Sequence, residues 1–401
     1  MAQSIVPISD SVYWVGVNDR RTDLFESIWP LPKGVSYNSY LIVDRKVALL
    51  DTVKEMSLSG YLEKLKAVLA SERKIDYLIV HHLEPDHSGS VRVLREIFPE
   101  MKIVGNKRTT GFLERLYGIK HGVDVVRDGD ELELGGKKLK FFLTPMVHWP
   151  ETMMSYELGD KILFSGDAFG GFGTLNGGIF DDTLDIAYFE DEILRYFSNI
   201  VGRYSPMVQK ALAQLKDVDV KIVAPTHGPI WRKHPGRIIE LYDRWSRYEA
   251  EEGVVIVYAS MYGNTERMAE AVAEGLSEQG CQTVRLHDVS RTHVSYTLRD
   301  IWRYQGLILG SPTYDTKVFP LMDSLLKLLE TKMVKKRAVG IFGSYGWSGG
   351  AVKAMTGFVR NNSLELVEPV VEAQFAADAG EMEQCRQLGR NMAGHIRESS
   401  G

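Results

Sequence analysis

The chain has 401 residues, of which 44% are hydrophobic and 25% charged, the composition of an ordinary globular protein. Its 48 basic and 53 acidic residues give a net charge of -5, so binding to nucleic acid is not expected. The only cysteines are Cys281 and Cys385, which excludes a disulfide framework and a metal site built on cysteine pairs. Neither a signal-peptide pattern nor a run of about 18 apolar residues occurs, so we expect a cytoplasmic protein without a membrane segment.

The first half of the chain alternates short apolar runs with polar turns, which predicts a mixed α/β domain with many strands. The predicted strands are residues 40–43, 47–50, 77–80, 140–143, 161–164 and 221–224, and the predicted helices are residues 58–69 and 90–97. A charged helix follows over residues 235–252, and Gly253 predicts its end.

The pattern changes after Gly253. Residues 254–259 form a purely apolar run, as expected of a parallel strand that is buried on both faces. Helices are then predicted at 265–279, 319–329, 350–361 and 381–396, between strands at 283–286, 307–310, 338–342 and 364–371. Such alternation predicts a doubly wound parallel sheet. Because a domain has about 150 residues and the pattern changes near Gly253, we expect two domains, residues 1–252 and 253–401.

Seven potential metal ligands follow predicted strands of the first domain. Four of them lie within six residues after strand 77–80, in a segment that Pro85 stiffens and that we expect to be a loop. The others come singly after later strands. The seven are His82, Glu84, Asp86, His87, His148, Asp167 and His227.

Seven ligands exceed the needs of one ion, so the pattern predicts two ions, with Asp167 as the expected bridge. Imidazole and carboxylate ligands without thiolate suit iron, manganese or zinc, and the carboxylate-rich set favours iron. The remaining histidines are expected to be hydrogen-bonded surface residues. They are His81, His121, His234, His287, His293 and His395.

Three loops of the second domain combine small residues, free backbone amides and aromatic rings at predicted strand ends. Backbone amides at the start of a helix bind phosphate, and an aromatic face can stack on a planar ring. The candidate residues for such a ring and its phosphate are Ser260, Met261, Tyr262, Gly263, Asn264 and Thr265 in the first loop, Ser311, Pro312, Thr313, Tyr314 and Asp315 in the second, and Ser344, Tyr345, Gly346, Trp347, Ser348 and Gly349 in the third. The arrangement resembles flavodoxin, whose ligand is FMN, and this resemblance implies FMN at this edge of the sheet.

The His-x-Glu-x-Asp-His motif of residues 82–87 resembles the metallo-β-lactamase superfamily motif His-x-His-x-Asp-His, with Glu84 in place of the second histidine. Together with the later ligands and the flavodoxin-like half, it resembles the flavodiiron proteins over nearly the whole chain. The resemblance implies an α/β fold, a metallo-β-lactamase-like αββα sandwich followed by a flavodoxin-like doubly wound parallel sheet. It also implies FMN, two non-haem irons, and reduction of dioxygen to water or nitric oxide to nitrous oxide.

The resemblance further assigns His82, Glu84 and His148 to one iron, and Asp86, His87 and His227 to the other, with Asp167 bridging. It implies a head-to-tail homodimer, or a dimer of such dimers. No Cys-x-x-Cys module occurs, so we expect a separate electron donor, a rubredoxin-like protein or a reduced deazaflavin coenzyme. Two alternatives stay open: a dizinc hydrolase fused to a flavodoxin-like module, and a flavin electron carrier with a vestigial metal domain.

Overall fold

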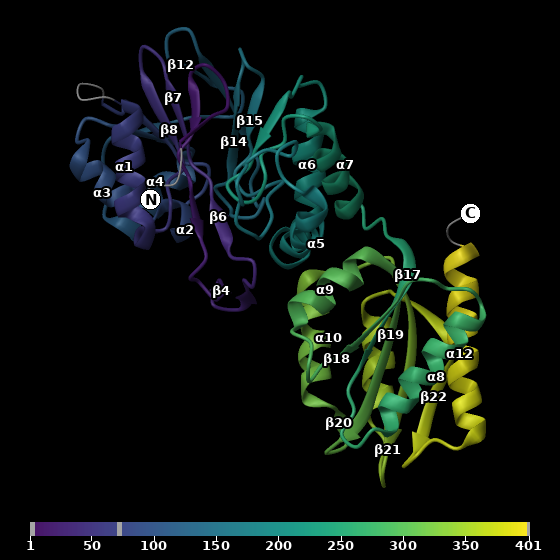
Figure 1. The fold of residues 1–401 in the computed structure, drawn as a ribbon. Coiled ribbons are helices and arrows are strands. Elements are labelled where there is room, and N and C mark those ends of the chain that lie inside the picture. The colour runs from purple at the N-terminus through teal and green to yellow at the C-terminus, as the bar shows by residue number, and fades with distance from the viewer. Residues whose placement is uncertain (1–4, 70–73, 399–401) are drawn as a thin grey trace. The chain divides into compact units, whose positions relative to one another are not determined.

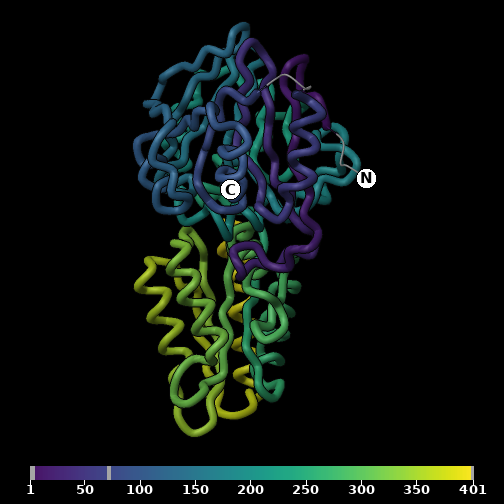
Figure 2. Tube along the Cα trace, turned by 90° about the vertical axis from the view of Figure 1, so that its left-hand side faces the viewer, coloured from purple at the N-terminus to yellow at the C-terminus, as the bar shows by residue number. Residues whose placement is uncertain are grey.

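The computed structural model describes residues 5–69 and 74–398. The chain divides into two compact units, one ending at Ser246 and one beginning at Arg247. Figure 2 traces the chain through both units, purple to teal in the first and green to yellow in the second. No sheet contains strands of both units among the described residues, so each unit is described by itself below.

The larger sheet of the first unit has seven strands in the order β1-β2-β7-β8-β9-β10-β11. These are β1 (Val6–Pro7), β2 (Val12–Trp14), β7 (Tyr40–Val43), β8 (Val47–Leu50), β9 (Tyr77–Ile79), β10 (Lys102–Gly105) and β11 (Val123–Val125). Strands β8, β9 and β10 pair in parallel. All residues of β8 and β9 are buried, because both faces of the sheet are covered.

A second sheet has five strands in the order β12-β13-β14-β15-β16. These are β12 (Glu131–Glu133), β13 (Lys138–Leu143), β14 (Met153–Glu157), β15 (Ile162–Phe164) and β16 (Ile222–Ala224). Two hairpin-like pairs complete the strands, β3 (Val17–Asp19) with β6 (Val35–Tyr37) and β4 (Leu24–Phe25) with β5 (Trp29–Pro30).

Helices cover the outer faces of the two sheets, with α1, α3 and α4 on one side and α5, α6 and α7 on the other (Figure 1). This is the predicted αββα sandwich, which is confirmed. The helices are α1 (Leu58–Leu69), α2 (Pro85–Ser88), α3 (Val91–Ile97), α4 (Lys107–Tyr117), α5 (Ile186–Tyr196), α6 (Ser205–Leu215) and α7 (Pro235–Ser246). Three short helical turns join them, η1 (Glu55–Ser57), η2 (Phe197–Val201) and η3 (Gly202–Tyr204).

The second unit contains a parallel sheet in the order β18-β17-β19-β21-β22, with β20 paired antiparallel to β19. The strands are β17 (Glu251–Tyr258), β18 (Val284–Asp288), β19 (Tyr304–Tyr314), β20 (Lys317–Val318), β21 (Ala338–Tyr345) and β22 (Glu365–Gln374). Helices between the strands make each connection a crossover, as parallel pairing requires. The predicted doubly wound parallel sheet is confirmed.

Helices α8 and α12 cover one face of this sheet, and α9 and α10 cover the other (Figure 1). The helices are α8 (Asn264–Glu278), α9 (Val294–Arg303), α10 (Pro320–Lys332), α11 (Ala351–Asn361) and α12 (Ala379–Glu398). A buried cluster under α8 and α12 includes Val254, Ile256, Met268, Val272, Leu388 and Met392. The apolar stripe of α8 therefore packs against β17, as its helical spacing predicts.

The charged helix predicted over residues 235–252 is wrong at its end. Helix α7 ends at Ser246, and Tyr248 follows with a φ of 60°, a left-handed conformation that a continuing helix does not allow. Residues 251 and 252 already belong to β17. Gly253, the predicted stop, lies inside that strand, where its register with β19 shifts between Glu251 and Val254.

Candidate metal centre and flavin site

The first four candidate ligands follow β9, two of them before and two of them on the single helical turn α2. Pro85 takes the first position of α2, where its missing N–H costs nothing, and the carbonyl of Glu84 accepts hydrogen bonds from the N–H groups of His87 and Ser88 (3.0 Å each). Asp86 and His87 therefore lie on a helical turn and not in the predicted loop. The turn holds the ligand side chains on rigid backbone.

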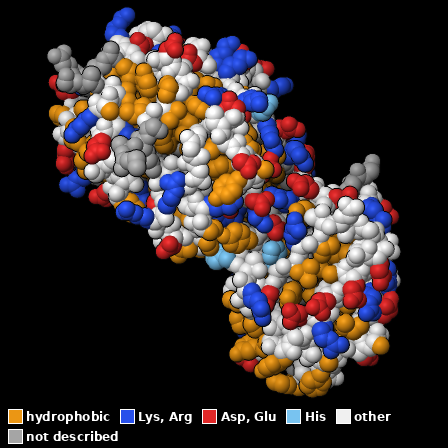
Figure 3. Space-filling view, viewed as in Figure 1, with side chains coloured by type: hydrophobic (Ala, Val, Ile, Leu, Met, Phe, Trp, Pro, Cys, Tyr) orange, Lys and Arg blue, Asp and Glu red, His pale blue; other side chains and the backbone are white. Residues whose placement is uncertain are grey.

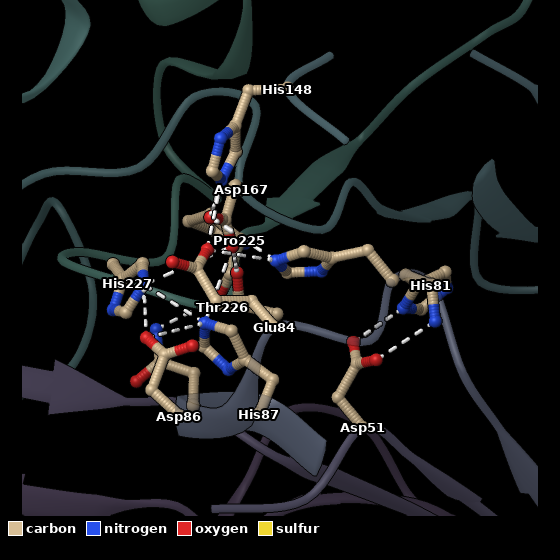
Figure 4. Close-up of polar contacts among 12 residues, drawn as sticks. Asp51, His81, Glu84, Asp86, His87, His148, Asp167, Pro225, Thr226 and His227 are labelled. Atoms are coloured by element: carbon tan, nitrogen blue, oxygen red, sulfur yellow. Dashed lines mark hydrogen bonds and ion pairs between the residues drawn. The ribbon is translucent and has the colours of Figure 1, made fainter. Parts of the chain in front are cut away.

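The other three candidate ligands follow strands of the five-stranded sheet. His148 comes after β13, Asp167 after β15 and His227 after β16. Because β15 and β16 are parallel neighbours, their following loops lie together, and the N–H of Thr226 donates to the carbonyl of Gly166 (2.9 Å). The ligand loops of both sheets thus meet at one place (Figure 4).

Four buried side chains, His82, Glu84, His148 and Asp167, form the first ligand group. The Nε2 atom of His148 lies 3.0 Å from Oε2 of Glu84 and 3.0 Å from Oδ2 of Asp167. The Nε2 atom of His82 lies 3.4 Å from the same Asp167 oxygen. Two imidazole nitrogens and two carboxylate oxygens therefore point at one small volume.

The second ligand group consists of Asp86, His87 and His227. The two Nε2 atoms of its histidines are 2.9 Å apart, and each lies 3.4 Å from Oδ2 of Asp86. The Nδ1 atom of His227 lies 2.8 Å from the carbonyl of Ser36, an acceptor that fixes the ring and leaves Nε2 for a ligand bond.

Asp167 lies between the two groups and offers one oxygen to each. Its Oδ2 faces His82 and His148, whereas its Oδ1 lies 3.3 Å from Nε2 of His87 and 3.8 Å from Nε2 of His227. This is the arrangement expected of a carboxylate that bridges two ions.

The donor set fits a pair of metal ions. Several buried ligand atoms have no hydrogen-bond partner within the described part of the chain, among them both nitrogens of His82, Oε2 of Glu84, both oxygens of Asp86 and Nδ1 of His87. Such a concentration of unsatisfied buried polar atoms is rare in a folded protein unless an ion completes it. Nitrogen and oxygen donors without thiolate suit iron, manganese or zinc.

The electrostatics of the cluster also favour cations. Burial alone would raise the pKa of Asp167, but the imidazoles of His82, His87 and His227 outweigh it and hold that pKa well below its ordinary value. Burial disfavours charge on His148, yet contact with Asp167 and Glu84 raises its pKa to about 9. Asp167 thus stays ionised and favours a proton on His148, and a metal ion would displace that proton.

Aromatic side chains that the sequence analysis missed surround the second group. The ring centroid of His227 lies 5.4 Å from that of Phe25, 5.7 Å from that of Tyr37 and 5.4 Å from that of Tyr196. Phe25 comes from β4, Tyr37 from β6 and Tyr196 from the last residue of α5. No local motif marks them, because three distant segments supply one ring each.

His81 is not the surface residue that the sequence analysis expects. Its side chain is fully buried, with Nδ1 2.5 Å from Oδ2 of Asp51 and Nε2 2.8 Å from Oγ of Ser155. The same carboxylate also accepts the backbone N–H of His81 (2.9 Å). Both ring nitrogens are engaged in this contact set, so His81 supports the ligand segment from outside the two groups (Figure 4).

In the second unit, a cavity of about 680 Å³ lies at the carboxyl ends of β17, β19 and β21. All the predicted flavin-binding residues line it except Gly263, Ser311 and Gly349. Gly263 instead precedes α8 with a φ of 88°, and Ser311 is buried and accepts the N–H of Phe319 through its hydroxyl. Two lining residues were not predicted, Thr316 and Phe375.

The walls of this cavity suit a flat ring with a phosphate tail. Of the described residues that line it, none is Lys or Arg and Asp315 is acidic, so an anion would rest on neutral donors and on the start of α8, as backbone amides allow. The hydroxyls of Thr265 and Ser344 lie 2.9 Å apart and connect the first and third loops. Exposed aromatic residues stand at the rim, with Tyr262 90% and Trp347 89% exposed, and hydrophobic side chains gather at that end of the unit (Figure 3).

Among the helices of residues 5–69 and 74–398, none is both long enough and apolar enough to cross a membrane.

Comparison with known proteins matches two different families to the two units of the chain. Residues 35–228 match the family model described as ODP family beta lactamase, and residues 256–389 match Flavodoxin. The chain is 35% identical over 396 residues to a nitric oxide reductase of Moorella thermoacetica, covering 98% of both. It is 32% identical to an anaerobic nitric oxide reductase flavorubredoxin of Vibrio vulnificus, covering 97% of this chain and 79% of that one.

Solved structures agree over almost the full length. The rubredoxin oxygen:oxidoreductase of Desulfovibrio gigas superposes with a TM-score of 0.95 at 29% identity, covering 99% of this chain and 100% of that one. The flavodiiron protein of Giardia intestinalis gives 0.94 at 28% identity, covering 99% and 98%. The fold and the two sites define a metallo-β-lactamase-like domain joined to a flavodoxin domain. The chain belongs to the flavodiiron protein family and is an oxidoreductase.

Proposed function

We propose that the chain carries FMN and two non-haem irons and reduces dioxygen to water and nitric oxide to nitrous oxide. The names of its relatives support both substrates, since one relative is a nitric oxide reductase and one structural neighbour an oxygen oxidoreductase. The two cysteines are free thiols, in keeping with the reducing cytoplasm as the proposed compartment.

The observation that carries this proposal is the position of Asp167 between the two ligand groups. A carboxylate with one oxygen toward each group suits two ions held close together, and Glu84 adds a second carboxylate to the first group. Anionic oxygen stabilises ferric iron, which favours a redox pair over a dizinc hydrolytic site. His82, Glu84, His148 and Asp167 would hold one iron, and Asp86, His87, His227 and Asp167 the other.

Bound iron would pass electrons to the gas, and bound FMN would deliver those electrons to the iron. The chain's own residues set the environment of that chemistry. Phe25, Tyr37 and Tyr196 form a buried aromatic wall beside His227 that limits water at the site. The Tyr196 hydroxyl donates to Oδ2 of Asp167 and keeps the proposed bridging carboxylate in a fixed orientation.

The flavin would occupy the cavity of the second unit. Ser260, Asn264 and Thr265 stand where the phosphate would meet the start of α8, and Trp347 offers a face for the ring. Among the described residues that line this cavity, Asp315 is the only charged one, so no cation of the chain would lie beside a bound ring to stabilise negative charge on it.

Electron delivery defines the proposed partners. We propose a separate donor, a rubredoxin-like protein or a reduced deazaflavin coenzyme, and a head-to-tail homodimer in which each flavin serves the partner's irons. The longer Vibrio relative is named a flavorubredoxin, and this chain spans 79% of it, which supports a rubredoxin-type donor. Sedimentation of the loaded protein tests the dimer, and a fully active monomer would contradict it.

The direct test begins with the composition of the purified protein. We expect about two irons and one FMN per chain, by elemental analysis and flavin extraction. After anaerobic reduction, oxygen should reoxidise the protein with little release of hydrogen peroxide. With reduced rubredoxin as the donor, steady-state turnover should be measurable with each gas. Two zinc ions together with thioester hydrolysis would overturn the proposal.

A further inference from the structure

Glu151 lies three residues after His148 and is only 1% exposed. Its Oε1 accepts a hydrogen bond of 2.8 Å from the backbone N–H of Leu83, the residue between His82 and Glu84. A side chain from the His148 loop thus reaches the backbone of the neighbouring ligand segment. Neither ligand group includes Glu151.

The backbone around Glu151 is anchored on both sides. The side-chain amide of Asn106 donates to the carbonyl of Glu151, while Oδ1 of Asn106 caps α4 by accepting the N–H of Arg108 (2.9 Å). Two residues on, the N–H of Met153 donates to the carbonyl of His81 (2.9 Å). Residues 151–153 therefore hold residues 81–83 at two points, and one of these is the Glu151 side chain.

The stability of the fold does not by itself explain why residue 151 is a glutamate. The second oxygen, Oε2, is buried and has no hydrogen-bond partner among the described residues. An incompletely paired carboxylate inside a protein costs free energy, and an apolar side chain of similar size would avoid that cost. Among the described residues, the Glu151 side chain makes one hydrogen bond, and it ends on the backbone between two proposed metal ligands.

We propose that Glu151 is a positioning residue, which fixes the Leu83 peptide and thereby the directions of the His82 and Glu84 side chains toward the first iron. Outer partners that orient metal ligands change metal affinity by roughly 10–100-fold when they are removed. The inference rests on the proposed function, since it presumes that these ligands hold a metal.

Two substitutions separate the hydrogen bond from the charge. Glu151→Gln keeps the length and an oxygen that can accept from Leu83, but loses the charge. Glu151→Asp keeps the charge and is one methylene shorter, so it withdraws from the Leu83 N–H. Matched controls are Glu157→Gln and Glu157→Asp, at the far end of β14, where a buried carboxylate accepts the N–H groups of Gly159 and Asp160.

The full-length chain is loaded with ferrous iron without oxygen, and its release to a chelator is timed. We expect Glu151→Asp to release iron about 10–100-fold faster and Glu151→Gln to stay within about threefold of the wild type. Both Glu157 variants should match the wild type. The positioning role would be overturned if Glu151→Asp released iron at the wild-type rate, or if both Glu151 variants released iron equally fast.

A second readout needs no metal and separates this inference from the proposed function. In the metal-free chain, hydrogen exchange measured by mass spectrometry on a peptide spanning residues 82–88 should be faster in Glu151→Asp and unchanged in Glu151→Gln. Equal exchange in both variants would overturn the inference. A wild-type chain that takes up no pair of ions would instead contradict the proposed function, whatever the exchange result.

Discussion

The phenol of Tyr196 donates a hydrogen bond of 2.7 Å to Oδ2 of Asp167, the carboxylate that lies between the two ligand groups. The hydroxyl of Thr226 donates to the other oxygen, Oδ1. Each oxygen that faces a ligand group therefore also accepts one neutral donor from the protein. Two donors on opposite oxygens fix the plane of the carboxylate, which a bridge between two ions requires.

Replacing Tyr196 by Phe should loosen this carboxylate without removing a ligand. Burial comes first among the causes that raise the pKa of Tyr196 well above its ordinary value, so the phenol stays protonated and remains a donor. We expect two irons still to bind, with release to a chelator about tenfold faster. Tyr242→Phe is the control, because Tyr242 is equally buried and makes its hydrogen bond to the Gly170 carbonyl. Identical release rates from both variants would refute this role.

Glu84→His restores the histidine that the wider superfamily motif has at this position. Oε2 of Glu84 lies 3.0 Å from Nε2 of His148, so an imidazole there replaces anionic oxygen in the first ligand group. We expect less iron per chain, stronger zinc binding and loss of gas reduction, because neutral nitrogen stabilises ferric iron less well. Metal analysis after growth with both metals measures the shift. Full iron content with unchanged oxygen turnover would show that Glu84 is not a ligand.

Local spacing was enough to mark the candidate ligands but not to say how they meet. His82 to His87 stand out because four donors follow one apolar strand within six residues. That Asp167 lies between two groups depends on β15 and β16 being parallel neighbours, which is a long-range pairing. Single-sequence patterns carry no information on such pairing, so the sequence yields the bridge only as an expectation.

The helix and the histidine that the sequence patterns misjudged were missed for similar physical reasons. Helix α5 escaped prediction because its last turns are buried all round, including Arg195, whose guanidinium pairs with Glu192 (2.5 Å) inside the fold. Charged residues normally mark the exposed face of a helix, so a buried ion pair hides the apolar stripe. His81 was misplaced for a similar reason, since its partner Asp51 lies 30 residues earlier.

Trp347→Leu tests the flavin cavity. The indole is 89% exposed at the rim, and stacking on a bound ring would cover part of it. Loss of an aromatic partner costs about 0.5–1.5 kcal/mol, so the Kd for FMN should rise about 2- to 12-fold. Titration of the flavin-free chain with FMN, followed by flavin fluorescence, measures this. Tyr188→Leu, an exposed aromatic of the first unit, should leave the Kd unchanged. A wild-type Kd for Trp347→Leu would mean that the ring does not stack on this side chain.

The burial of Lys64 predicts that the free energy of unfolding changes with pH, independently of the metal and flavin sites. Its ammonium group is buried on α1, donates to the Gly16 carbonyl (2.5 Å) and lies 4.4 Å from the centre of the Trp14 ring. Burial lowers its pKa to about 8, below the ordinary value that it takes in the unfolded chain. Between those two values the unfolded chain binds the extra proton, so the free energy of unfolding should rise with pH from about 8 to about 10.5.

Lys64→Met should remove this contribution to the slope. The variant also loses the bond to Gly16, which costs about 1 kcal/mol at every pH, so the slope and not the level is the diagnostic quantity. Urea unfolding of wild type and variant at several pH values gives the difference between them. Lys66→Met is the control, because Lys66 is exposed on the same helix. Parallel curves for the wild type and Lys64→Met would mean that Lys64 titrates as it does in the unfolded chain.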